Sequence, residues 1–278
     1  MNPRLLQEIT RNIEIALQED EVSRDFTTLA CLPEKVQGMA TLKLKEEAVL
    51  AGLPFLPLIA YAIDPSLVVK THEKEGTHHL PDTTIATLEG DMRSLLSLER
   101  TLLNFFQHTT SIATQTSKYV AACAGKCDIL DTRKTLPGHR FTQKYAVSIG
   151  GGKNHRFHLA DQILIKDNHL TFLDVKEAIQ RAREKYPLKR LQIEVETFEM
   201  FEEARDAKPD AILLDNMPLS TIAKAVAHNP EGLYLEASGG IDLQNIRSYV
   251  EAGVNGISIG KVTHSVDAVD MNIEIRRT

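Results

Sequence analysis

Basic side chains gather at the ends of two short apolar runs in the middle of the sequence. Arg133 and Lys134 follow the first run, Lys166 ends the run Ile163–Ile165, and Arg156 lies between the two. Arginine offers a planar fork that binds carboxylate or phosphate through two hydrogen bonds, and lysine offers a point charge. If the two runs are strands of one sheet, these side chains converge. Such a pocket would receive a small molecule with several negative charges.

The charge of the chain is unevenly distributed. The 278 residues carry a formal net charge of −6 at pH 7. Residues 131–169 hold seven Lys or Arg against three Asp, which gives 7 − 3 = +4 and leaves −10 for the rest. A basic face that binds RNA is the alternative to an anion pocket, but aromatic stacking residues are scarce here and the chain is acidic. We therefore expect no nucleic-acid partner.

Acidic side chains follow in the next two apolar runs. Glu194 and Glu196 have the same parity in Gln-Ile-Glu-Val-Glu, so both should face one side of a strand. Asp215 ends the run after that. Carboxylates on adjacent strands could hold Mg²⁺ beside a phosphorylated substrate, and an ion pair with the neighbouring lysines is the alternative.

Glycine-rich segments end the last two apolar runs. These segments are Ser238-Gly239-Gly240 and 256–260. Barrel enzymes commonly build a phosphate site from backbone amides at such positions, although turn glycines have the same pattern. The earlier run 150–152 lacks the spacing of a P-loop or of a dinucleotide-binding loop.

Three further polar positions are ambiguous. His155 and His158 form an H-x-x-H pair, which without further ligands is a weak metal pattern, and surface histidines are the alternative. Arg100 shares a helical polar face with Asn104 and His108. By itself, Arg100 is most simply a solvated arginine.

Strand-like runs alternate with helical stretches after residue 125. This pattern predicts βαβ units and a parallel sheet, with polar residues at the carboxyl end of each strand, as in the active face of an α/β barrel. Six units are present rather than eight, so the barrel is expected to be open, with an edge for something else to cover. The expected strands are 129–130, 163–165, 191–195, 211–214, 233–237 and 257–259.

The first part of the chain has a different organisation. It predicts a helix at 1–19, a helix near 53–62 and strands at 39–44, 67–70 and 83–89, which together form an α+β domain. A helical pattern at 95–109 leads into the barrel, and residues 271–275 alternate like a strand that returns to the first domain. The expected domains are an N-terminal α+β sandwich at 1–109, joined by a strand within 268–278, and a barrel at 110–267.

The cysteine count and the apolar segments bear on the compartment. An odd number of cysteines, Cys31, Cys123 and Cys127, with no C-x-x-C pair fits a reducing compartment. The amphipathic, acid-containing start differs from a signal peptide. The uncharged, mostly apolar run 48–63 is short for a membrane span and contains Gly and Pro. These features predict a cytoplasmic protein with no membrane role.

Several motifs stand in an order typical of one family. The chain resembles quinolinate phosphoribosyltransferase, also called nicotinate-nucleotide pyrophosphorylase (carboxylating), over nearly its whole length. The motifs are Glu99-Arg100-Thr101, Asp131-Thr132-Arg133-Lys134-Thr135, Asn154-His155-Arg156, Leu164-Ile165-Lys166-Asp167-Asn168-His169, Glu194-Val195-Glu196, Leu214-Asp215-Asn216, Glu236-Ala237-Ser238-Gly239-Gly240 and Thr263-His264-Ser265.

The resemblance implies a fold, a partner and a reaction. The fold is an N-terminal α/β sandwich with an open α/β barrel, in a homodimer whose partner completes each active site. The reaction converts quinolinate and phosphoribosyl pyrophosphate to nicotinate mononucleotide, pyrophosphate and CO₂ in NAD biosynthesis, with Mg²⁺ and no organic cofactor.

The resemblance also assigns site residues. Catalytic roles fall to Lys166, Glu196 and Asp215, and the last two would hold the metal. The quinolinate pocket would be formed by Arg133, His155, Arg156 and Lys166, with Arg100 reaching in from the other subunit. The phosphoribosyl pyrophosphate site would be formed by Lys134, Glu196, Asp215, Ser238, Gly239, Gly260 and His264.

The sequence departs from the family pattern at a few positions. His139 and His158 replace an apolar residue and a glycine, and Lys261-Val262 replaces a more apolar pair. These departures bear on fine specificity and leave the reaction class unchanged. Two rival functions remain at this point: a phosphoribosyltransferase that uses nicotinate without decarboxylation, and a non-catalytic barrel that binds phosphorylated ligands.

Overall fold

The computed structural model describes residues 1–32 and 35–278, and these form two compact units. Unit 1 consists of Met1–Ser117, Thr135–Gly151 and Ser265–Thr278. Unit 2 consists of Lys118–Lys134 and Gly152–His264. Each unit has its own sheet and is described by itself.

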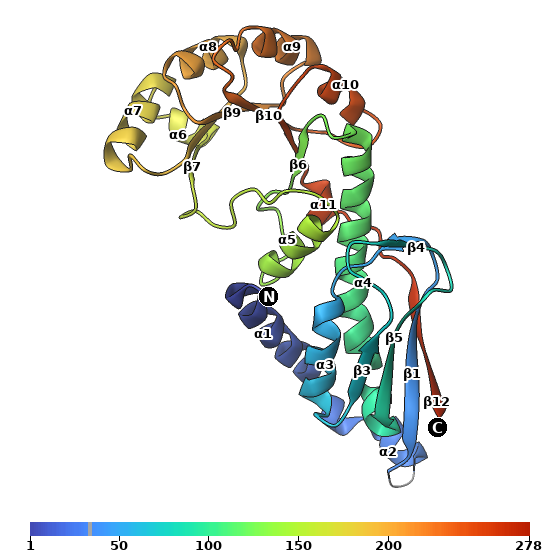
Figure 1. Cartoon of the computed structure of the whole chain (residues 1–278). Coiled ribbons are helices and arrows are strands. Elements are labelled where there is room, and N and C mark those ends of the chain that lie inside the picture. Colours follow the sequence, from blue (N-terminus) through green and yellow to red (C-terminus); the bar gives the residue numbers. More distant parts are fainter. Residues whose placement is uncertain (33–34) are drawn as a thin grey trace. The chain divides into compact units, whose positions relative to one another are not determined.

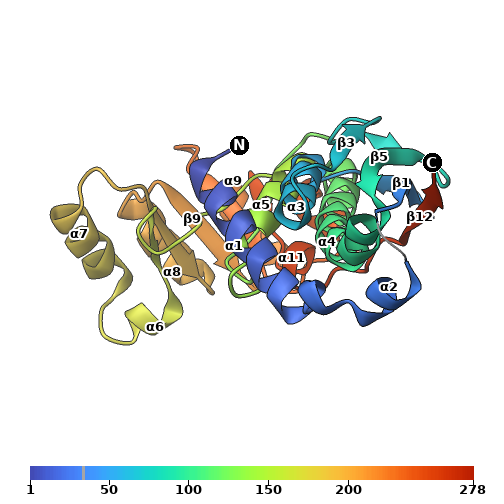
Figure 2. The same cartoon turned by 90° about the horizontal axis from the view of Figure 1, so that it is seen from below.

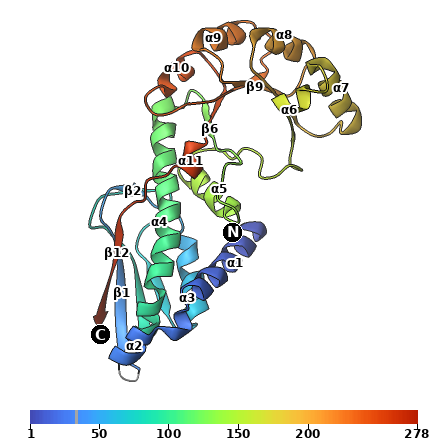
Figure 3. The same cartoon turned by 180° about the vertical axis from the view of Figure 1, so that it is seen from behind.

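Unit 1 contains a four-stranded antiparallel sheet in the order β12-β1-β5-β3 and a two-stranded sheet of β2 and β4. Figure 3 shows β12 beside β1. The strands are β1 (Gln37–Leu44), β2 (Ala48–Val49), β3 (Val68–Thr71), β4 (His78–His79), β5 (Thr84–Asp91) and β12 (Met271–Arg277). The helices are α1 (Pro3–Glu19), η1 (Val22–Arg24), α2 (Phe26–Cys31), η2 (Leu53–Phe55), α3 (Leu56–Ile63), α4 (Met92–Cys123), which continues past the boundary of unit 1, and α5 (Arg140–Ile149).

The core of unit 1 follows from the periodicity of its sequence. In β1, alternate residues Ala40, Leu42 and Leu44 are buried, as expected for a strand with one face against a core. In α1, Leu5 and Ile9 are buried one turn apart, on the face that meets α5 and α3. Helices α3 and α4 lie along the four-stranded sheet (Figure 2).

Helix α5 belongs to unit 1, and its first turn is hydrogen-bonded to α1. The N-cap residue of α5 makes no side-chain capping bond. The buried carboxylate of Glu8 instead accepts hydrogen bonds from the backbone N–H groups of Phe141 (3.1 Å) and Thr142 (2.7 Å). Residues 135–151 are therefore part of unit 1, although the sequence places them in the barrel domain.

Unit 2 contains a six-stranded parallel sheet in the order β6-β11-β10-β9-β8-β7. The six strands expected from the sequence are all present in it. They are β6 (Asp128–Leu130), β7 (Ile163–Ile165), β8 (Leu191–Val195), β9 (Ala211–Asp215), β10 (Tyr234–Ser238) and β11 (Gly256–Ser258). Figure 1 shows α7 to α10 along the outer side of the curved sheet. The helices are α6 (Asp167–Leu170), α7 (Val175–Lys185), α8 (Phe198–Asp206), α9 (Leu219–Ala227), α10 (Ile246–Glu251) and α11 (Lys261–His264).

The sheet of unit 2 has two ends and so forms an open α/β barrel. Strand β6 is at one end of the strand order and β7 is at the other. A short segment extends the sheet beyond β6, because Lys153 donates its backbone N–H to the carbonyl of Ile129 (2.7 Å). In the described ranges, 1–32 and 35–278, no helix combines the length and the apolar character that a membrane crossing requires.

Candidate active site

A cavity of about 520 Å³ lies in unit 2 at the carboxyl ends of the parallel strands. Most of the residues that the sequence assigns to a site line this cavity. They are Arg133, Lys134, His155, Arg156, Lys166, Asp215, Ser238 and Gly239. Strands of one parallel sheet end at the same edge, which is why residues so far apart in the sequence meet here.

Two guanidinium groups form the most basic part of the cavity. The Nε atom of Arg133 is buried and has no hydrogen-bond partner among the described residues. Burial first, and then the charge of Arg133, lower the pKa of Arg156. A buried donor without an acceptor is costly. An anionic ligand would supply that acceptor and would also reduce the repulsion between the two arginines.

Lys166 is held at the end of β7 by an ion pair. Its Nζ atom lies 2.7 Å from Oε2 of Glu194 on the adjacent strand β8. The Lys166 side chain is 43% exposed, whereas that of Glu194 is 10% exposed. Glu194 therefore forms the ion pair with a lysine that the sequence leaves open as one of two alternatives. The pair fixes the lysine ammonium at the cavity wall.

The segment that carries His155 and Arg156 has no helix or strand of its own and is held by hydrogen bonds. The backbone N–H of His155 donates to Oδ1 of the buried Asp131 (2.8 Å). Together with the pairing of Lys153 to β6, this contact places the segment at the mouth of the barrel. The N–H of Arg156 donates to Nδ1 of the His155 ring (2.7 Å).

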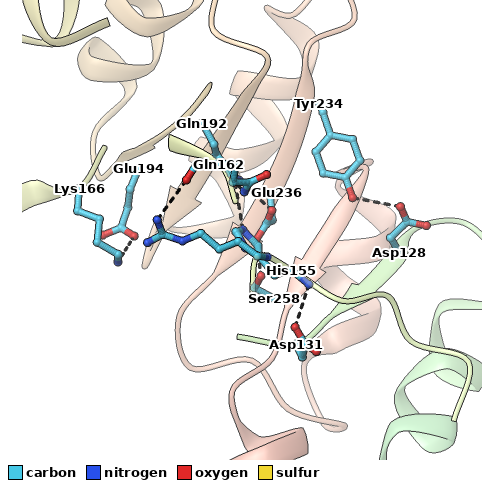
Figure 4. Close-up of polar contacts among 11 residues, drawn as sticks. Asp128, Asp131, His155, Gln162, Lys166, Gln192, Glu194, Tyr234, Glu236 and Ser258 are labelled. Atoms are coloured by element: carbon cyan, nitrogen blue, oxygen red, sulfur yellow. Dashed lines mark hydrogen bonds and ion pairs between the residues drawn. The ribbon is translucent and has the colours of Figure 1, made fainter. Parts of the chain in front are cut away.

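A buried hydrogen-bond network joins His155 to three strands (Figure 4). Nε2 of His155 lies 3.0 Å from Oε1 of Gln192 on β8. Nε2 of Gln192 donates to Oε2 of Glu236 on β10 (2.8 Å), and the hydroxyl of Ser258 on β11 donates to Oε1 of the same carboxylate. Nε2 of Gln162 also donates to Gln192 Oε1 (3.3 Å). The four residues Ser258, Glu236, Gln192 and His155 are called the floor network below.

Asp215 lies at the carboxyl end of β9, opposite Ser238 on β10. Its Oδ2 atom accepts a hydrogen bond from the side-chain amide of Asn216 (2.7 Å). Asn216 is itself fixed, because its backbone N–H donates to the carbonyl of Ser238 (2.9 Å). Gly239 packs directly against Asn216: a Cβ atom at position 239 would lie 2.9 Å from the backbone nitrogen of Asn216. The glycine is therefore required by the close approach of two chain segments.

A second close approach brings three expected site residues together beside the cavity. A Cβ atom on Gly260 would lie 2.8 Å from Nε2 of His264 and 3.2 Å from Cδ of Lys134. The hydroxyl of Thr263 donates to the carbonyl of Lys134 (2.8 Å). Gly260 and His264 are not among the residues that line the cavity, but Gly260 packs between His264 and Lys134, and Lys134 lines it.

The structure does not bring two expected site residues into the cavity. Glu196 follows directly after β8 and is exposed. Arg100 is exposed on α4 in unit 1. Within residues 1–32 and 35–278, no three His, Cys, Asp or Glu side chains form a cluster that could hold a metal ion on their own.

The three departures from the family pattern lie away from the cavity lining. His158 pairs with Asp161 (2.9 Å), and Lys261 pairs with Asp242 (3.3 Å). The ring of His139 packs in unit 1 at 6.4 Å from that of Phe105.

Sequence reasoning did not identify four polar residues of the site. They are Asp131, Gln192, Glu236 and Ser258. The signal that could have found two of them, Gln192 and Glu236, is the period of two: residues 192 and 194, and residues 236 and 238, occupy alternate positions of their strands. The cavity is lined by Glu194, Ser238 and Ser258, so the same parity points Gln192 and Glu236 into the barrel interior.

A larger cavity of about 810 Å³ lies in unit 1. Its walls include the apolar side chains of Ile15 and Phe105, together with His108 and His139. Burial first, and then the charge of His139, lower the pKa of His108, and burial also lowers the pKa of His139. Both rings are therefore neutral near pH 7. This cavity has one arginine, Arg11, and one carboxylate, Glu19, whereas the unit 2 cavity gathers four Lys or Arg side chains with three carboxylates, so we assign the chemistry to unit 2.

The chain matches two domain families along its length. The quinolinate phosphoribosyl transferase N-terminal domain matches residues 25–110, and the C-terminal domain of the same name matches residues 112–274. The probable nicotinate-nucleotide pyrophosphorylase (carboxylating) of Methanocaldococcus jannaschii is 37% identical, over 94% of this chain and 95% of that protein. The nicotinate-nucleotide pyrophosphorylase (carboxylating) of Mycobacterium leprae is 36% identical, over 95% of each.

Solved structures agree with the sequence relatives. The nicotinate-nucleotide pyrophosphorylase from Francisella tularensis is 33% identical, with a TM-score of 0.93 over 97% of this chain and 96% of that one. The human nicotinic acid phosphoribosyltransferase has a TM-score of 0.63 over 92% of this chain and 73% of that one, at 12% identity, which shows a shared fold alone. The chain therefore belongs to the quinolinate phosphoribosyltransferase family.

Proposed function

We propose that this protein transfers the phosphoribosyl group of phosphoribosyl pyrophosphate to quinolinate. The products are nicotinate mononucleotide, pyrophosphate and CO₂, and the step belongs to NAD biosynthesis. The observation that carries the proposal is the meeting of Arg133, Arg156 and Lys166 with Asp215 around one cavity. Relatives at 36–37% identity over most of the chain bear the name of the carboxylating pyrophosphorylase, which supports it.

The basic part of the cavity suits a planar dicarboxylate. Nε of Arg133 is a buried donor with no hydrogen-bond partner in the described part of the chain. Arg156 lies close enough that, after burial, the charge of Arg133 also lowers its pKa. Guanidinium groups bind carboxylates through two parallel hydrogen bonds. In this proposal the arginines bind the two carboxylates of quinolinate, and Lys166 adds a third positive charge. Nicotinate, with one carboxylate, would leave a donor unpaired.

The side of the cavity that carries Lys134 and Asp215 suits the phosphoribosyl pyrophosphate. The backbone of Ser238 and Gly239 lies beside Asp215, and Lys134 lines the same cavity. We propose that these groups, with Gly260 and His264 next to Lys134, bind the phosphates and the ribose. Asp215 would stabilise the positive charge that develops on the ribose as pyrophosphate leaves.

The residues present also fit Mg²⁺ in the mode that nucleotide enzymes use. Mg²⁺ is usually held by one or two carboxylates together with substrate phosphates and water. Asp215 has one oxygen in a hydrogen bond and further acceptor capacity on its carboxylate. Glu196 follows β8 at the same edge of the sheet and is the proposed second ligand. When bound, Mg²⁺ would neutralise charge on the leaving pyrophosphate.

In the proposed reaction the protein mainly brings two anions together. The ring nitrogen of quinolinate attacks the anomeric carbon of the ribose, and the carbon–oxygen bond to pyrophosphate breaks. The carboxylate next to the ring nitrogen then leaves as CO₂, and a proton takes its place on the ring. Binding both anions beside Arg133, Arg156 and Lys166 offsets their mutual repulsion and sets their orientation.

We further propose a cytoplasmic homodimer in which Arg100 serves the site of the partner. The exposed position of Arg100 on α4 supports this assignment. The three cysteines are free, which fits a reducing compartment.

One assay tests the proposed function. The purified protein is incubated with quinolinate, phosphoribosyl pyrophosphate and Mg²⁺, and CO₂ and nicotinate mononucleotide are measured. Formation of both products in equal amounts is the expected result. Turnover of nicotinate without CO₂ would support the non-decarboxylating rival instead. Tight binding of phosphoribosyl pyrophosphate with no product from either pyridine acid would support a non-catalytic barrel.

A further inference from the structure

The floor network contains a buried carboxylate that the reaction described above does not use. Glu236 is 2% exposed and lies on β10, two residues before Ser238 of the cavity lining. We propose that Glu236 is a positioning residue that acts through Gln192 to fix the tautomer and the orientation of His155, and thereby the wall of the pyridine pocket. The identity of the bound pyridine rests on the proposed function, whereas the tautomer does not.

The direction of each hydrogen bond follows from the chemistry of the groups. An ionised carboxylate only accepts, so the NH₂ group of Gln192 must face Glu236, as it does at 2.8 Å. The amide oxygen of Gln192 then faces the His155 ring, with Oε1 at 3.0 Å from Nε2. Because an amide oxygen accepts, Nε2 of His155 must carry the hydrogen. Nε2 of Gln162 donates to the same oxygen, which agrees with the assignment of this atom as the acceptor.

The other ring nitrogen of His155 gives the same answer independently. Nδ1 accepts the backbone N–H of Arg156 at 2.7 Å, so Nδ1 carries no hydrogen. If Nδ1 carried a hydrogen, it would face the backbone N–H of Arg156 as a second donor, with no acceptor between them. Both sides of the ring therefore select the neutral tautomer with hydrogen on Nε2.

This arrangement decides how His155 can meet a ligand. Both nitrogens are engaged by the protein, so the ring offers a ligand its faces and its carbon edge rather than an acid or a base. The ring also holds the backbone of Arg156, one of the two arginines of the cavity. Loss of the network should therefore weaken pyridine binding, through both the wall and the arginine, and leave the phosphate side unaffected.

A direct ion pair is the competing explanation. Oε1 of Glu236 lies 3.7 Å from Nε2 of His155, close enough for a charged pair if the ring were protonated. The variant Glu236→Gln distinguishes the relay through Gln192 from a direct ion pair between Glu236 and His155. Ser258 can accept a hydrogen bond as well as donate one, so the new amide can turn its NH₂ group to Ser258 and keep its oxygen toward Gln192. The network survives this change, whereas an ion pair would be lost.

The test combines ring spectroscopy on the free enzyme with kinetics. Histidine labelled with ¹⁵N is incorporated, and the NMR signals of the His155 ring are assigned with the variant His155→Asn. The ¹⁵N signals of the ring are then recorded in the wild type and in Glu236→Gln, Glu236→Met and Gln192→Met. Tyr234→Phe is the matched control, because Tyr234 is on the same strand but donates to Asp128 (3.2 Å) outside the network (Figure 4).

The proposal makes definite predictions for each protein. The wild type, Glu236→Gln and Tyr234→Phe should show hydrogen on Nε2 and a bare Nδ1. In both Met variants the Nε2 signal should shift. Their KM for quinolinate should rise about tenfold, with the KM for phosphoribosyl pyrophosphate and kcat within about threefold of the wild type. Glu236→Gln should stay within about threefold on all three parameters.

Each contrary result overturns the proposal. Hydrogen on Nδ1 in the free wild type refutes the tautomer without any variant. If Glu236→Gln changes the Nε2 signal and the KM for quinolinate as much as Glu236→Met does, the charge of Glu236 acts directly on His155. If Glu236→Met does not fold, Gln192→Met decides in its place, and an unchanged Nε2 signal and KM in that variant refute the relay. Failure of the proposed function has a different signature: the expected ring signals in a protein that does not turn over quinolinate.

Discussion

The replacement of Gly239 by alanine tests how the site holds Asp215. Gly239 has a φ of +101°, which side-chain-bearing residues rarely adopt, so alanine costs roughly 1–2 kcal/mol for the backbone alone. The new Cβ would lie 2.5 Å from Cγ and 2.9 Å from the backbone nitrogen of Asn216, whereas ordinary contact begins near 3.4 Å. Asn216 must therefore move by 3.4 − 2.5 = 0.9 Å at Cγ and by 3.4 − 2.9 = 0.5 Å at the nitrogen.

The displacement of Asn216 should affect both stability and turnover. Overpacking of this kind costs about 1–3 kcal/mol, so Gly239→Ala should lower the free energy of unfolding by roughly 2–5 kcal/mol in total. Because the Asn216 amide donates to Asp215, its displacement releases that carboxylate. We expect kcat/KM for phosphoribosyl pyrophosphate to fall about 100-fold, which corresponds to about 2.7 kcal/mol.

Gly232→Ala is the matched control for the backbone term. Gly232 has a φ of +69° in the same unit, and a Cβ there would meet nothing within 4 Å. This variant should lose about 1 kcal/mol in a urea titration and keep its activity. Equal unfolding free energies for the two variants would refute the clash. A destabilised Gly239→Ala with normal kinetics would refute the link from Asn216 to Asp215.

Four further outcomes are expected. Nicotinate should be a poor substrate, with kcat/KM at least about 100-fold below that of quinolinate, because it leaves an arginine donor unpaired; similar efficiencies in steady-state assays would contradict this. Asp215→Asn should abolish most turnover while calorimetry still detects quinolinate, and normal turnover would remove the residue from the mechanism. A doubly tagged dimer of one Arg100→Ala and one Lys166→Ala chain should regain about half of wild-type activity, since both defects fall in one site; a purified mixed dimer as inactive as its parents would contradict the shared site. At pH 8 a thiol reagent should label the exposed Cys31 first, because burial raises the pKa of Cys127 to about 12 and Cys123 is buried; equal rates for all three would contradict the burial.

The sheet of the barrel could be predicted because its signals are local. Each strand is a short apolar run followed by polar residues, and the parallel order then brings the ends together. Arg133 and Lys166 are examples: each follows its own strand, so the prediction of a shared cavity needed no distant contact. The lengths of the helices were harder to predict.

Helix α4 was expected at 95–109 but extends from Met92 to Cys123. Its second half is rich in Ser and Thr, which usually disfavour helix interiors because their hydroxyls compete for backbone groups. Here the hydroxyls bond to the helix itself: Thr114 donates to the carbonyl of Thr110 (2.7 Å), and Thr116 to that of Ile112 (2.7 Å). Thr110, Thr114 and Thr116 are also buried, so tertiary packing outweighs the local preference.

Contacts between distant residues set what the sequence could not reveal. The floor network depends on the register of three strands, and the assignment of α5 to unit 1 depends on Glu8, which is 134 residues from Thr142. The residues next to Glu236 and to Glu8 in the sequence do not indicate the hydrogen-bond partner of either carboxylate. Parity could have predicted that Glu236 faces the barrel interior, but only the fold shows that it is linked through Gln192 to His155.

The pairing of β12 with β1 has a consequence for protein synthesis. β1 is complete at Leu44, whereas β12 begins at Met271, so 271 − 44 = 227 positions separate them. At about 5 to 20 residues per second, a ribosome needs roughly 11 to 45 seconds to cover that distance. During this time the edge of β1 from Gly38 to Leu44 is open to pairing with other nascent chains. Lys43, which later pairs with Glu274 at 2.7 Å, places a charge on that open edge and discourages such pairing. A messenger truncated after the barrel would therefore encode a complete parallel sheet together with a first domain prone to aggregation.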